Sequence, residues 1–464
     1  MLTLKAIFKP RMSYLKIYAF LAVVVSVAST SSLIGLDTRQ TLSLTVFAAK
    51  TAATLFFWSF RLAFGFAGLA ILLVAGLISI ELLIEFAYLD VILFLACMMI
   101  VIGYLEEEHF FEYIVNKMLK LAKSTYRLII IIAISSWLFA ALVDEVTSIL
   151  FMTSTVLRIA SLYGIDPIPM IFICIFATNI GSSATVVGNP IGVMIAFQGG
   201  LSFVDFLRWA TPISAASLGV MLPLCIRYYG GYLRGIENSS IKEAALYGFD
   251  EKPIGIRRPL AIFTSLIVGL VMHRQIEHLL GLEEGTMLLG AAMIMAAVVL
   301  LLNWRRAREI VEVRVDWWTL TFFITLFATV GTLKYVGLIH IIAEGFASMS
   351  HIGEFLFPLF IYLSGILSAI LDNILAVAIL IPIIKELEIL GIVSQHYWWG
   401  MLFAGTFFGN LLPIGSTANI VALGIVERRG IGHISIRSWI KPGALVTLST
   451  ITLATLLLYF QTLF

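Results

Sequence analysis

The chain has 464 residues, of which 60% are hydrophobic and 12% charged, and its formal net charge is +2. Apolar runs of about 20 residues, long enough to cross a bilayer as helices, recur along the whole sequence. This composition excludes a soluble enzyme and predicts an all-α integral membrane protein embedded in the lipid bilayer. We expect no nucleic-acid partner and no cofactor, because Cys97, Cys174 and Cys225 are scattered without metal-binding spacing.

The first apolar run follows four basic residues and reaches Leu36, which is longer than the core of a signal peptide. We therefore interpret residues 1–40 as a retained first span. Eleven spans are predicted in chain order, at 13–36, 41–60, 62–80, 88–105, 168–198, 211–227, 258–273, 285–303, 317–333, 398–425 and 443–462.

Two further apolar runs each carry acidic residues near the middle. The run 128–157 is interrupted by Asp144 and Glu145, and the run 355–384 by Asp372. A carboxylate inside a bilayer is costly unless it faces a partner, an ion or water. A single helix of this length would measure about 45 Å against a hydrocarbon core of about 30 Å. We therefore predict two re-entrant helical hairpins whose tips meet at the middle of the membrane.

An internal repeat places these hairpins in two related halves. Four pairs of residues recur at an offset of 226 to 228: Asp90 with Asp316, Asp144 with Asp372, Gly164 with Gly391, and Gly188 with Gly415. Each half then contains five spans and one hairpin, and the first span lies outside the repeat.

Five crossings per half place equivalent loops on opposite sides of the membrane, and the Lys/Arg bias supports this. Three segments rich in Lys and Arg each have an equivalent segment in the other half with one such residue or none. The basic segments are 107–127, 304–315 and 426–441, and their equivalents are 334–353, 81–87 and 199–210. The sequence thus predicts a 5+5 inverted repeat in the cell membrane, with the N-terminus and the linker 228–257 cytoplasmic and the C-terminus outside.

One span in each half is interrupted by Gly and Pro among small polar residues, at 178–190 and 409–419. Such broken helices at the midplane line the sites of many secondary transporters, where freed backbone groups and side-chain oxygens bind ions. The predicted ion- and substrate-binding residues are Asp144, Glu145, Thr147, Asn179, Ser182, Ser183, Thr185, Asn189, Asp372, Asn373, Asn410, Ser416, Thr417 and Asn419. Those expected to set backbone geometry are Gly181, Gly188, Pro190, Gly409, Pro413 and Gly415.

The stretch 142–148, together with Asn179-Ile180-Gly181 and Gly188-Asn189-Pro190, resembles the arsenite permease and sodium/proton antiporter branch of the ion transporter superfamily, which includes the melanosomal P-protein. The resemblance implies a scaffold, a mobile transport domain, an elevator mechanism and a homodimer. Two positions depart from that pattern: Glu145 replaces a frequent Asn and adds a carboxylate, and Gly192 removes an amide.

The predicted division of the chain follows from the repeat and the resemblance. Its parts are 1–40 (extra span), 41–124 (scaffold, repeat 1), 125–227 (transport part, repeat 1), 228–257 (linker), 258–353 (scaffold, repeat 2) and 354–464 (transport part, repeat 2).

We expect an H⁺- or Na⁺-coupled transporter of a small inorganic solute such as arsenite or a related oxyanion. The alternatives are a Na⁺/H⁺ antiporter and a Na⁺-coupled carboxylate or other anion transporter. Na⁺ is expected at Asp144, Asn179, Asp372 and Asn410. A channel would need a continuous polar pore, and the glycine-containing motif of an intramembrane aspartyl protease is absent around both aspartates.

Each site residue also has a plain structural interpretation. Asp144 and Asp372 could cap helix starts, Glu145 could be structural, and the amides could join helices by hydrogen bonds. Lys50 lies inside an apolar span without an explanation from the sequence. The segment 109–121 is predicted to be an amphipathic helix at the membrane interface.

Overall fold

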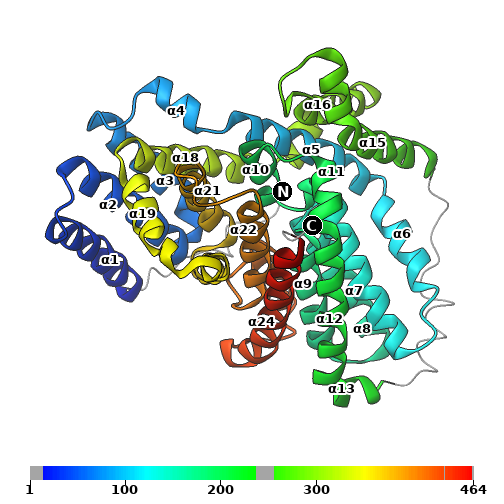
Figure 1. Cartoon of the computed structure of the whole chain (residues 1–464). Coiled ribbons are helices and arrows are strands. Elements are labelled where there is room, and N and C mark those ends of the chain that lie inside the picture. The colour runs from blue at the N-terminus through cyan, green and yellow to red at the C-terminus, as the bar shows by residue number, and fades with distance from the viewer. Residues whose placement is uncertain (1–13, 237–254, 433, 462–464) are drawn as a thin grey trace. The chain divides into compact units, whose positions relative to one another are not determined.

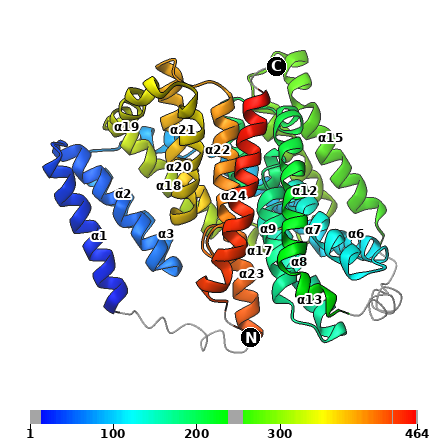
Figure 2. The same ribbon diagram turned by 60° about the horizontal axis from the view of Figure 1, so that its bottom comes forward.

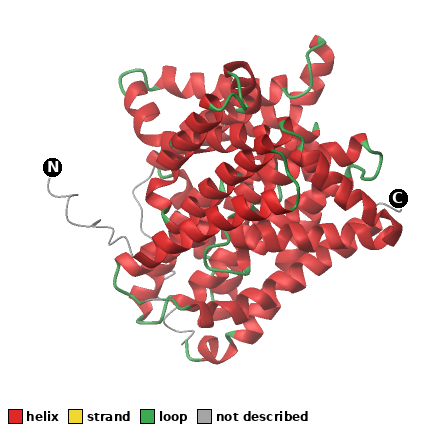
Figure 3. Cartoon of the chain, turned by 90° about the vertical axis from the view of Figure 1, so that its left-hand side faces the viewer, coloured by secondary structure: helices red, strands yellow, loops and turns green. Residues whose placement is uncertain are grey.

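A computed structural model describes residues 14–236, 255–432 and 434–461. Helices dominate these ranges, and no strand occurs in them (Figure 3). The all-α fold predicted from the sequence is confirmed. Residues 1–13, at the start of the predicted extra span, lie outside the described residues. So do residues 237–254, which form most of the predicted cytoplasmic linker.

Helices of the first half follow one another with short connections. They are α1 (Tyr14–Leu33), α2 (Thr38–Phe56), η2 (Trp58–Phe60), α3 (Arg61–Val74), α4 (Ile80–Phe86), α5 (Leu89–Glu107), α6 (Phe110–Leu119), α7 (Thr125–Leu142), α8 (Glu145–Tyr163), α9 (Ile168–Gly181), η3 (Val186–Gly188), α10 (Pro190–Gly199), α11 (Phe203–Asp205), η4 (Phe206–Ala210), α12 (Thr211–Tyr228) and α13 (Gly230–Arg234).

The second half has a similar series. It contains α15 (Arg257–Leu280), α16 (Thr286–Leu302), α17 (Ala307–Arg314), α18 (Trp317–Tyr335), α19 (Leu338–Ala347), η5 (Ser348–Phe355), α20 (Leu356–Leu371), α21 (Asn373–Ile389), α22 (His396–Phe407), η6 (Phe408–Asn410), α23 (Thr417–Arg428) and α24 (Ile436–Gln461).

The order of the helices repeats from one half to the other. Helix α5 begins at Leu89 and α18 at Trp317, and α6 begins at Phe110 and α19 at Leu338, so both pairs of starts keep the offset of the sequence repeat. Both members of each pair also have the same length, 19 residues for α5 and α18 and 10 for α6 and α19. The sequence repeat is thus a repeat of structural elements.

One tight helix contact recurs at equivalent residues of the two halves. A Cβ added at Gly103 of α5 would collide with the side chain of Arg314 in α17, and one added at Gly331 of α18 would collide with Phe86 of α4. Gly103 and Gly331 are equivalent positions of the repeat, and so are Phe86 and Arg314. In both halves, a side chain therefore packs directly on a glycine of the equivalent helix. This side chain is Arg314 on Gly103 and Phe86 on Gly331.

Both acidic runs form pairs of helices joined at the predicted residues. Helices α7 and α8 pack against each other and are separated by Val143 and Asp144, and α20 and α21 pack against each other around Asp372. Asp372 has φ 86°, a left-handed conformation that breaks the helix there. Each acidic run is thus a pair of packed helices joined at the predicted residues. Helices α7 and α8 are each long and apolar enough to cross a membrane, so the re-entrant course of the hairpins and the depth of their tips stay predictions.

Helices α8 and α21 end near equivalent glycines. Gly164 has φ 63° and Gly391 has φ 69°, which are conformations that favour glycine after a helix.

The described chain divides into two compact units. One contains residues up to Leu89 and Trp317–Glu344, and the other contains Asp90–Asp316 and Gly345–Phe464. All the predicted site residues lie in the second unit. In this unit α7, α8, α9 and α12 run side by side, as Figures 1 and 2 show.

Eight of the described helices, or nine when a bent pair is counted as one span, are long and apolar enough to cross a membrane. This confirms a multi-pass membrane protein. Three of the eight, Thr125–Leu142, Glu145–Leu162 and Leu338–Leu371, lie in or lead into the predicted hairpins and are not among the eleven expected spans. Several of the expected spans are instead shorter apolar helices, such as α16 with 17 residues, or are broken, such as α9 and α10.

Lys50, which no sequence pattern explains, is buried in the first unit. Its Nζ donates to the hydroxyls of Thr325, at 2.9 Å, and Thr329, at 3.3 Å. Its ammonium group also lies 5.4 Å from the centre of the Phe322 ring. Helix α18 thus supplies the polar partners that allow this lysine to be buried.

Candidate functional site

The site is built where one helix of each half stops and restarts. Helix α9 ends at Gly181 and α10 begins at Pro190, whose fixed φ and missing N–H suit the first turn of a helix. In the second half α22 ends at Phe407, η6 follows, and α23 begins at Thr417. Asn189 caps α10 by accepting from the Gly192 N–H at 2.8 Å. Ser416 caps α23 in the same way.

Two glycines allow the first broken helix to pack closely. A Cβ on Gly181 would lie 2.7 Å from the Cα of Trp137 in α7, and one on Gly188 would lie 2.9 Å from the carbonyl oxygen of Ala140. Because neither glycine has a side chain, the backbone of the broken helix can contact the backbone of α7 directly, as expected for residues that set backbone geometry. Gly415, near the end of the second break, similarly approaches the carbonyl oxygen of Gly409.

Four buried side chains join the two broken helices. Asn179 donates from Nδ2 to Oδ1 of Asn410, at 2.7 Å, and to Oδ1 of Asn419, at 2.9 Å. Oγ of Ser416 lies 2.9 Å from Oδ1 of Asn179 and 2.8 Å from Oδ1 of Asn419. Asn419 in turn donates to the carbonyl oxygen of Gly409 at 2.7 Å. The structure thus brings predicted residues of both halves into one network.

The remaining polar residues of the first break bind mainly backbone. Asn189 donates to Oγ of Ser182 at 2.9 Å, and Ser183 donates to the Ile180 carbonyl at 2.8 Å. Thr185 donates to the carbonyl oxygen of Ala141 in α7. The bond from Thr185 joins the break to the end of the first hairpin arm, and the other two stay within the break.

Asp144 is half-buried at the start of α8, where it acts as an N-cap. One carboxylate oxygen accepts from the N–H groups of Val146, at 2.7 Å, and Thr147, at 2.8 Å. This is the structural role considered for it from the sequence, and its second oxygen takes no part in these two bonds.

Asp372 and Asn373 both cap the start of α21. Asp372 accepts from the N–H of Asn373 at 2.9 Å, and the Asn373 side chain accepts from the N–H of Ile374 at 2.9 Å. The Nδ2 group of Asn373 is buried and has no hydrogen-bond partner among the described residues. The same holds for Nδ2 of Asn410. Nδ2 of Asn410 is therefore available to a ligand, whereas Nδ2 of Asn373 lies beside the carboxyl group of Glu145.

Glu145 follows Asp144 but has a different environment. Its side chain is 1% exposed, and neither carboxylate oxygen has a hydrogen-bond partner among the described residues. Its charged neighbours are the carboxylates of Asp372 and Asp144, and the side chains of Asn373 and Ser182 lie close to it. A buried carboxylate in this position is stable only when it is protonated or bound to a cation.

Each hairpin contributes its second arm to the opposite half. Helix α8 packs against α23, and α21 packs against α10. Glu145 at the start of α8 and Asn373 at the start of α21 therefore come together although they belong to different halves of the chain. Such a centre can bind a cation at its carboxylates and an anion at its amide groups and helix N-termini. No cluster of three His, Cys, Asp or Glu side chains able to bind a metal ion occurs in the described ranges.

A cavity of about 410 Å³, lined by both apolar and charged side chains, lies beside the first hairpin. Thr147, a predicted site residue, lines it, and so do residues that were not predicted as part of the site: Glu106, Glu112, Asn116, Ser154 and Arg158. Glu106 also interacts electrostatically with Asp144. The acidic residues belong to the end of α5 and to α6, so their position beside α8 follows from tertiary packing.

Comparisons with known proteins agree on a transporter. The sequence pattern of the family described as citrate transporter (CitMHS) matches residues 53–404. An uncharacterized transporter of Mycobacterium tuberculosis H37Rv is 31% identical over 380 residues, which cover 80% of this chain and 86% of that protein. The P protein of Homo sapiens is 24% identical over 431 residues, covering 76% of this chain and 51% of that protein.

Among solved structures, the YdaH transporter of Alcanivorax borkumensis matches with a TM-score of 0.56 and 18% identity, over 84% of this chain and 88% of that one. This similarity shows a shared fold.

Proposed function

The chain belongs to the citrate transporter family, a family of secondary transporters, and from its site we propose that transport is coupled to H⁺ or Na⁺ binding at Glu145. Membership confirms the resemblance to the ion transporter superfamily and a transporter rather than an enzyme. The substrate, the coupling ion and the mechanism of movement belong to the proposal.

One observation carries the coupling: Glu145 is buried with both carboxylate oxygens unpartnered among the described residues. Its nearest charged groups are themselves carboxylates, which repel its negative charge. Binding of H⁺ or Na⁺ removes this repulsion. The cap residues Asp144 and Asp372 hold the helix starts and add negative potential that attracts the cation.

An elevator mechanism within an inverted repeat connects cation binding to movement. The transport part carries the hairpins and broken helices across the scaffold. While Glu145 is ionised and empty, moving it past the apolar scaffold is costly, and the bound cation lowers that cost. Coupling follows because the loaded centre crosses more readily than the empty one.

The substrate that the geometry favours is a small anion that crosses together with the cation. The buried amide nitrogen of Asn410 has no partner among the described residues and can donate to an oxygen of an anion, and that of Asn373 can do so when a cation or proton neutralises Glu145 beside it. The family description makes citrate the first solute to test. Arsenite and related oxyanions remain in the proposed class, although the three cysteines lie outside the residues of the centre.

Na⁺/H⁺ exchange is the second candidate. It needs only a cation site, and the negative potential that Asp372 and Asp144 place on Glu145 favours it. In that case an imposed Na⁺ gradient drives H⁺ flux, and an imposed pH gradient drives Na⁺ flux, without any anion.

The test is a flux screen in proteoliposomes with imposed Na⁺ and pH gradients. Citrate, arsenite and solute-free conditions are compared for wild type and Glu145→Gln. Because glutamine imitates the neutral carboxyl but cannot exchange a proton, we expect gradient-driven accumulation to fall by about tenfold or more. Solute exchange without a gradient should persist, since the centre of this variant remains neutral.

Glu312→Gln is the matched control, because Glu312 is exposed and forms its ion pair with Arg308 within α17. It should transport like wild type. In Asp144→Asn and Asp372→Asn the asparagine can still cap the helix but has no charge, so these variants test the negative potential apart from the capping role. If Glu145→Gln accumulates solute as well as wild type under every gradient, the assignment of coupling to Glu145 is wrong.

A further inference from the structure

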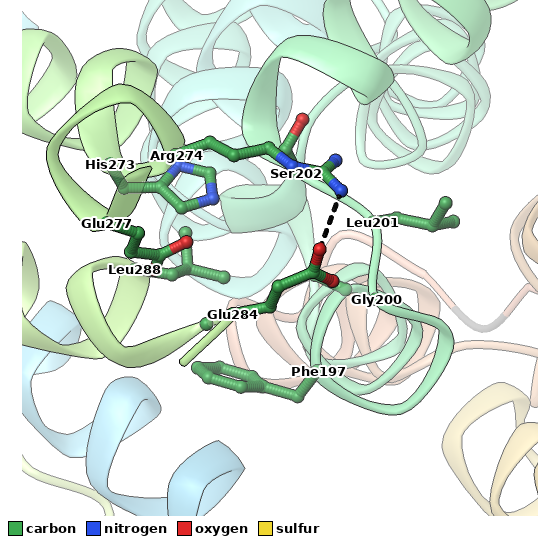
Figure 4. Close-up of a pocket in the computed structure, with 11 residues that line it drawn as sticks. Phe197, Gly200, Leu201, Ser202, His273, Arg274, Glu277, Glu284 and Leu288 are labelled. Atoms are coloured by element: carbon green, nitrogen blue, oxygen red, sulfur yellow. Dashed lines mark hydrogen bonds and ion pairs between the residues drawn. The ribbon is translucent and has the colours of Figure 1, made fainter. Parts of the chain in front are cut away.

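A second polar cluster lies apart from the transport centre, around a cavity of about 190 Å³. The end of α10, the loop before α11, and helices α15 and α16 line this cavity. Figure 4 shows His273, Arg274 and Glu277 of α15 on one side and Gly200 and Ser202 on the other. None of these residues takes part in the function proposed above.

Arg274 is bound to two carboxylates at the same time. Its Nη1 lies 3.0 Å from Oδ2 of Asp205, and its Nη2 lies 3.1 Å from Oε1 of Glu284, the contact drawn in Figure 4. The planar guanidinium holds both partners in fixed directions, which a lysine could not do.

The two carboxylates belong to different parts of the fold. Asp205 is fixed to the α11 turn, because the same oxygen accepts from the N–H of Ser202 at 2.8 Å and from its hydroxyl at 2.6 Å. Glu284 lies in the turn between α15 and α16, on the same helical pair as Arg274. The ion pair Arg274–Asp205 therefore joins α15 to the α11 turn, whereas the ion pair Arg274–Glu284 stays within the pair α15–α16.

The pair α15–α16 behaves as one piece. Its helices pack along each other, and the buried carboxylate of Glu277 accepts from the N–H of Met287 at 2.7 Å, which fixes the start of α16 on α15. Helix α15 packs against α11, and residues at the end of α10 line the cavity beside it. In the predicted division, α10 to α12 belong to the transport part and α15–α16 to the scaffold, and both groups lie within the compact unit that contains Asp90–Asp316.

We propose that Arg274 is a positioning residue of the transport cycle: its ion pair with Asp205 holds the transport part against the scaffold in the state described here. The inference rests on the proposed function, because the pair needs to break only if these parts move relative to each other. With 45% of Arg274 and 26% of Asp205 exposed, water competes for the contact, so the pair can break in each cycle.

Removing the pair should shift the equilibrium between the two end states by about two- to fivefold. Apparent affinity scales with the fraction of protein in the binding-competent state. In Arg274→Gln, KM should therefore rise on the membrane face to which this state opens and fall on the opposite face. Vesicles of the two orientations measure both values. A variant that is only less stable would lose Vmax without this opposite change in KM.

Glu284→Gln is the matched control, since it removes the ion pair that stays within α15–α16 and leaves the one to Asp205. Its ratio of KM values should equal that of wild type. Arg274→Lys keeps the charge but cannot hold both carboxylates in the directions set by the guanidinium, so its KM ratio should lie between those of wild type and Arg274→Gln. An unchanged KM ratio in an active Arg274→Gln variant overturns the proposal, and so does an equal change in Glu284→Gln.

Hydrogen exchange of the purified protein distinguishes this proposal from the transport function itself. Arg274→Gln should speed exchange both at 200–206 and at 281–285, whereas Glu284→Gln should speed it only at 281–285. If wild type moves no solute, the proposed function fails, and the exchange pattern still decides whether the contact holds the two segments. Unchanged exchange at 200–206 in Arg274→Gln contradicts it.

Discussion

Asp144 and Glu145 are sequence neighbours with different physical roles. Asp144 lies just before α8, so its side chain reaches back to the free N–H groups of the first turn. Glu145 is the first residue of the helix, and its side chain is buried without a hydrogen-bond partner in the described part of the chain. A shift of one residue around a helix start therefore separates a capping carboxylate from a buried one without a hydrogen-bond partner in the described part of the chain.

At the same scale, the glycines of the first break can be tested by adding one methyl group. Gly181→Ala would place a Cβ against the backbone of Trp137, which cannot rotate away, so we expect a loss of about 1–3 kcal/mol and a lower Tm. Gly219→Ala is the control, because that Cβ meets nothing within 4 Å in the middle of α12.

Alanine also favours the helix, so Gly219→Ala should leave Tm equal or raise it, by up to about 1 kcal/mol. Thermal unfolding in detergent measures both variants. Equal Tm values for Gly181→Ala and wild type would show that α7 and α9 can separate without cost.

Among the elements, the broken helices show how far sequence patterns reach. Gly, Pro and small polar residues at 178–190 and 409–419 predict that a helix stops there, because these residues favour caps and turns. The hydrogen-bond partners of each amide depend on how α9 and α23 pack. No periodic pattern in the sequence predicts this packing. The network of Asn179, Asn410, Ser416 and Asn419 is therefore a property of packing.

Two adjacent residues of α9 test this network. Asn179→Asp replaces the amide donor by a carboxylate that faces the oxygens of Asn410 and Asn419, and we expect a cost of about 3 kcal/mol. Thr178→Val is the control: the Thr178 hydroxyl is buried without a partner among the described residues, so its removal should change stability by less than about 1 kcal/mol.

Thermal unfolding and solute flux are measured for both variants. A strong Tm loss only in Asn179→Asp supports the network. The same loss in Thr178→Val would instead indicate that this region tolerates no change of any kind.

For the whole molecule, the repeat and the compact units divide the chain differently. Helix α5 lies in the second unit except for its first residue, whereas its counterpart α18 lies in the first unit. Likewise α4 belongs to the first unit and α17 to the second. Each unit thus combines helices from both halves, which the sequence repeat alone does not predict. The scaffold and transport boundaries predicted from the sequence stay a prediction.

The inverted orientation of the repeat is tested by single cysteines at equivalent positions. Lys120 follows α6, Ser348 follows α19 at the equivalent position of the repeat, and both are exposed. We expect a membrane-impermeant maleimide to label Lys120→Cys from the cytoplasmic side and Ser348→Cys from the outside. Wild type, with its three native cysteines, gives the background. Labelling of both positions from one side would rule out an odd number of crossings per half.

The sequence by itself determined the membrane class, the repeat and the places where helices break, because these depend on local composition and on charge against an apolar background. It also determined which residues supply carboxylates and amides. Only the tertiary structure decided that Asp144 is a cap while Glu145 lacks a hydrogen-bond partner among the described residues, and that Arg274 contacts Asp205. Those differences arise from side-chain direction and from packing between distant segments, where one turn of a helix changes which groups meet.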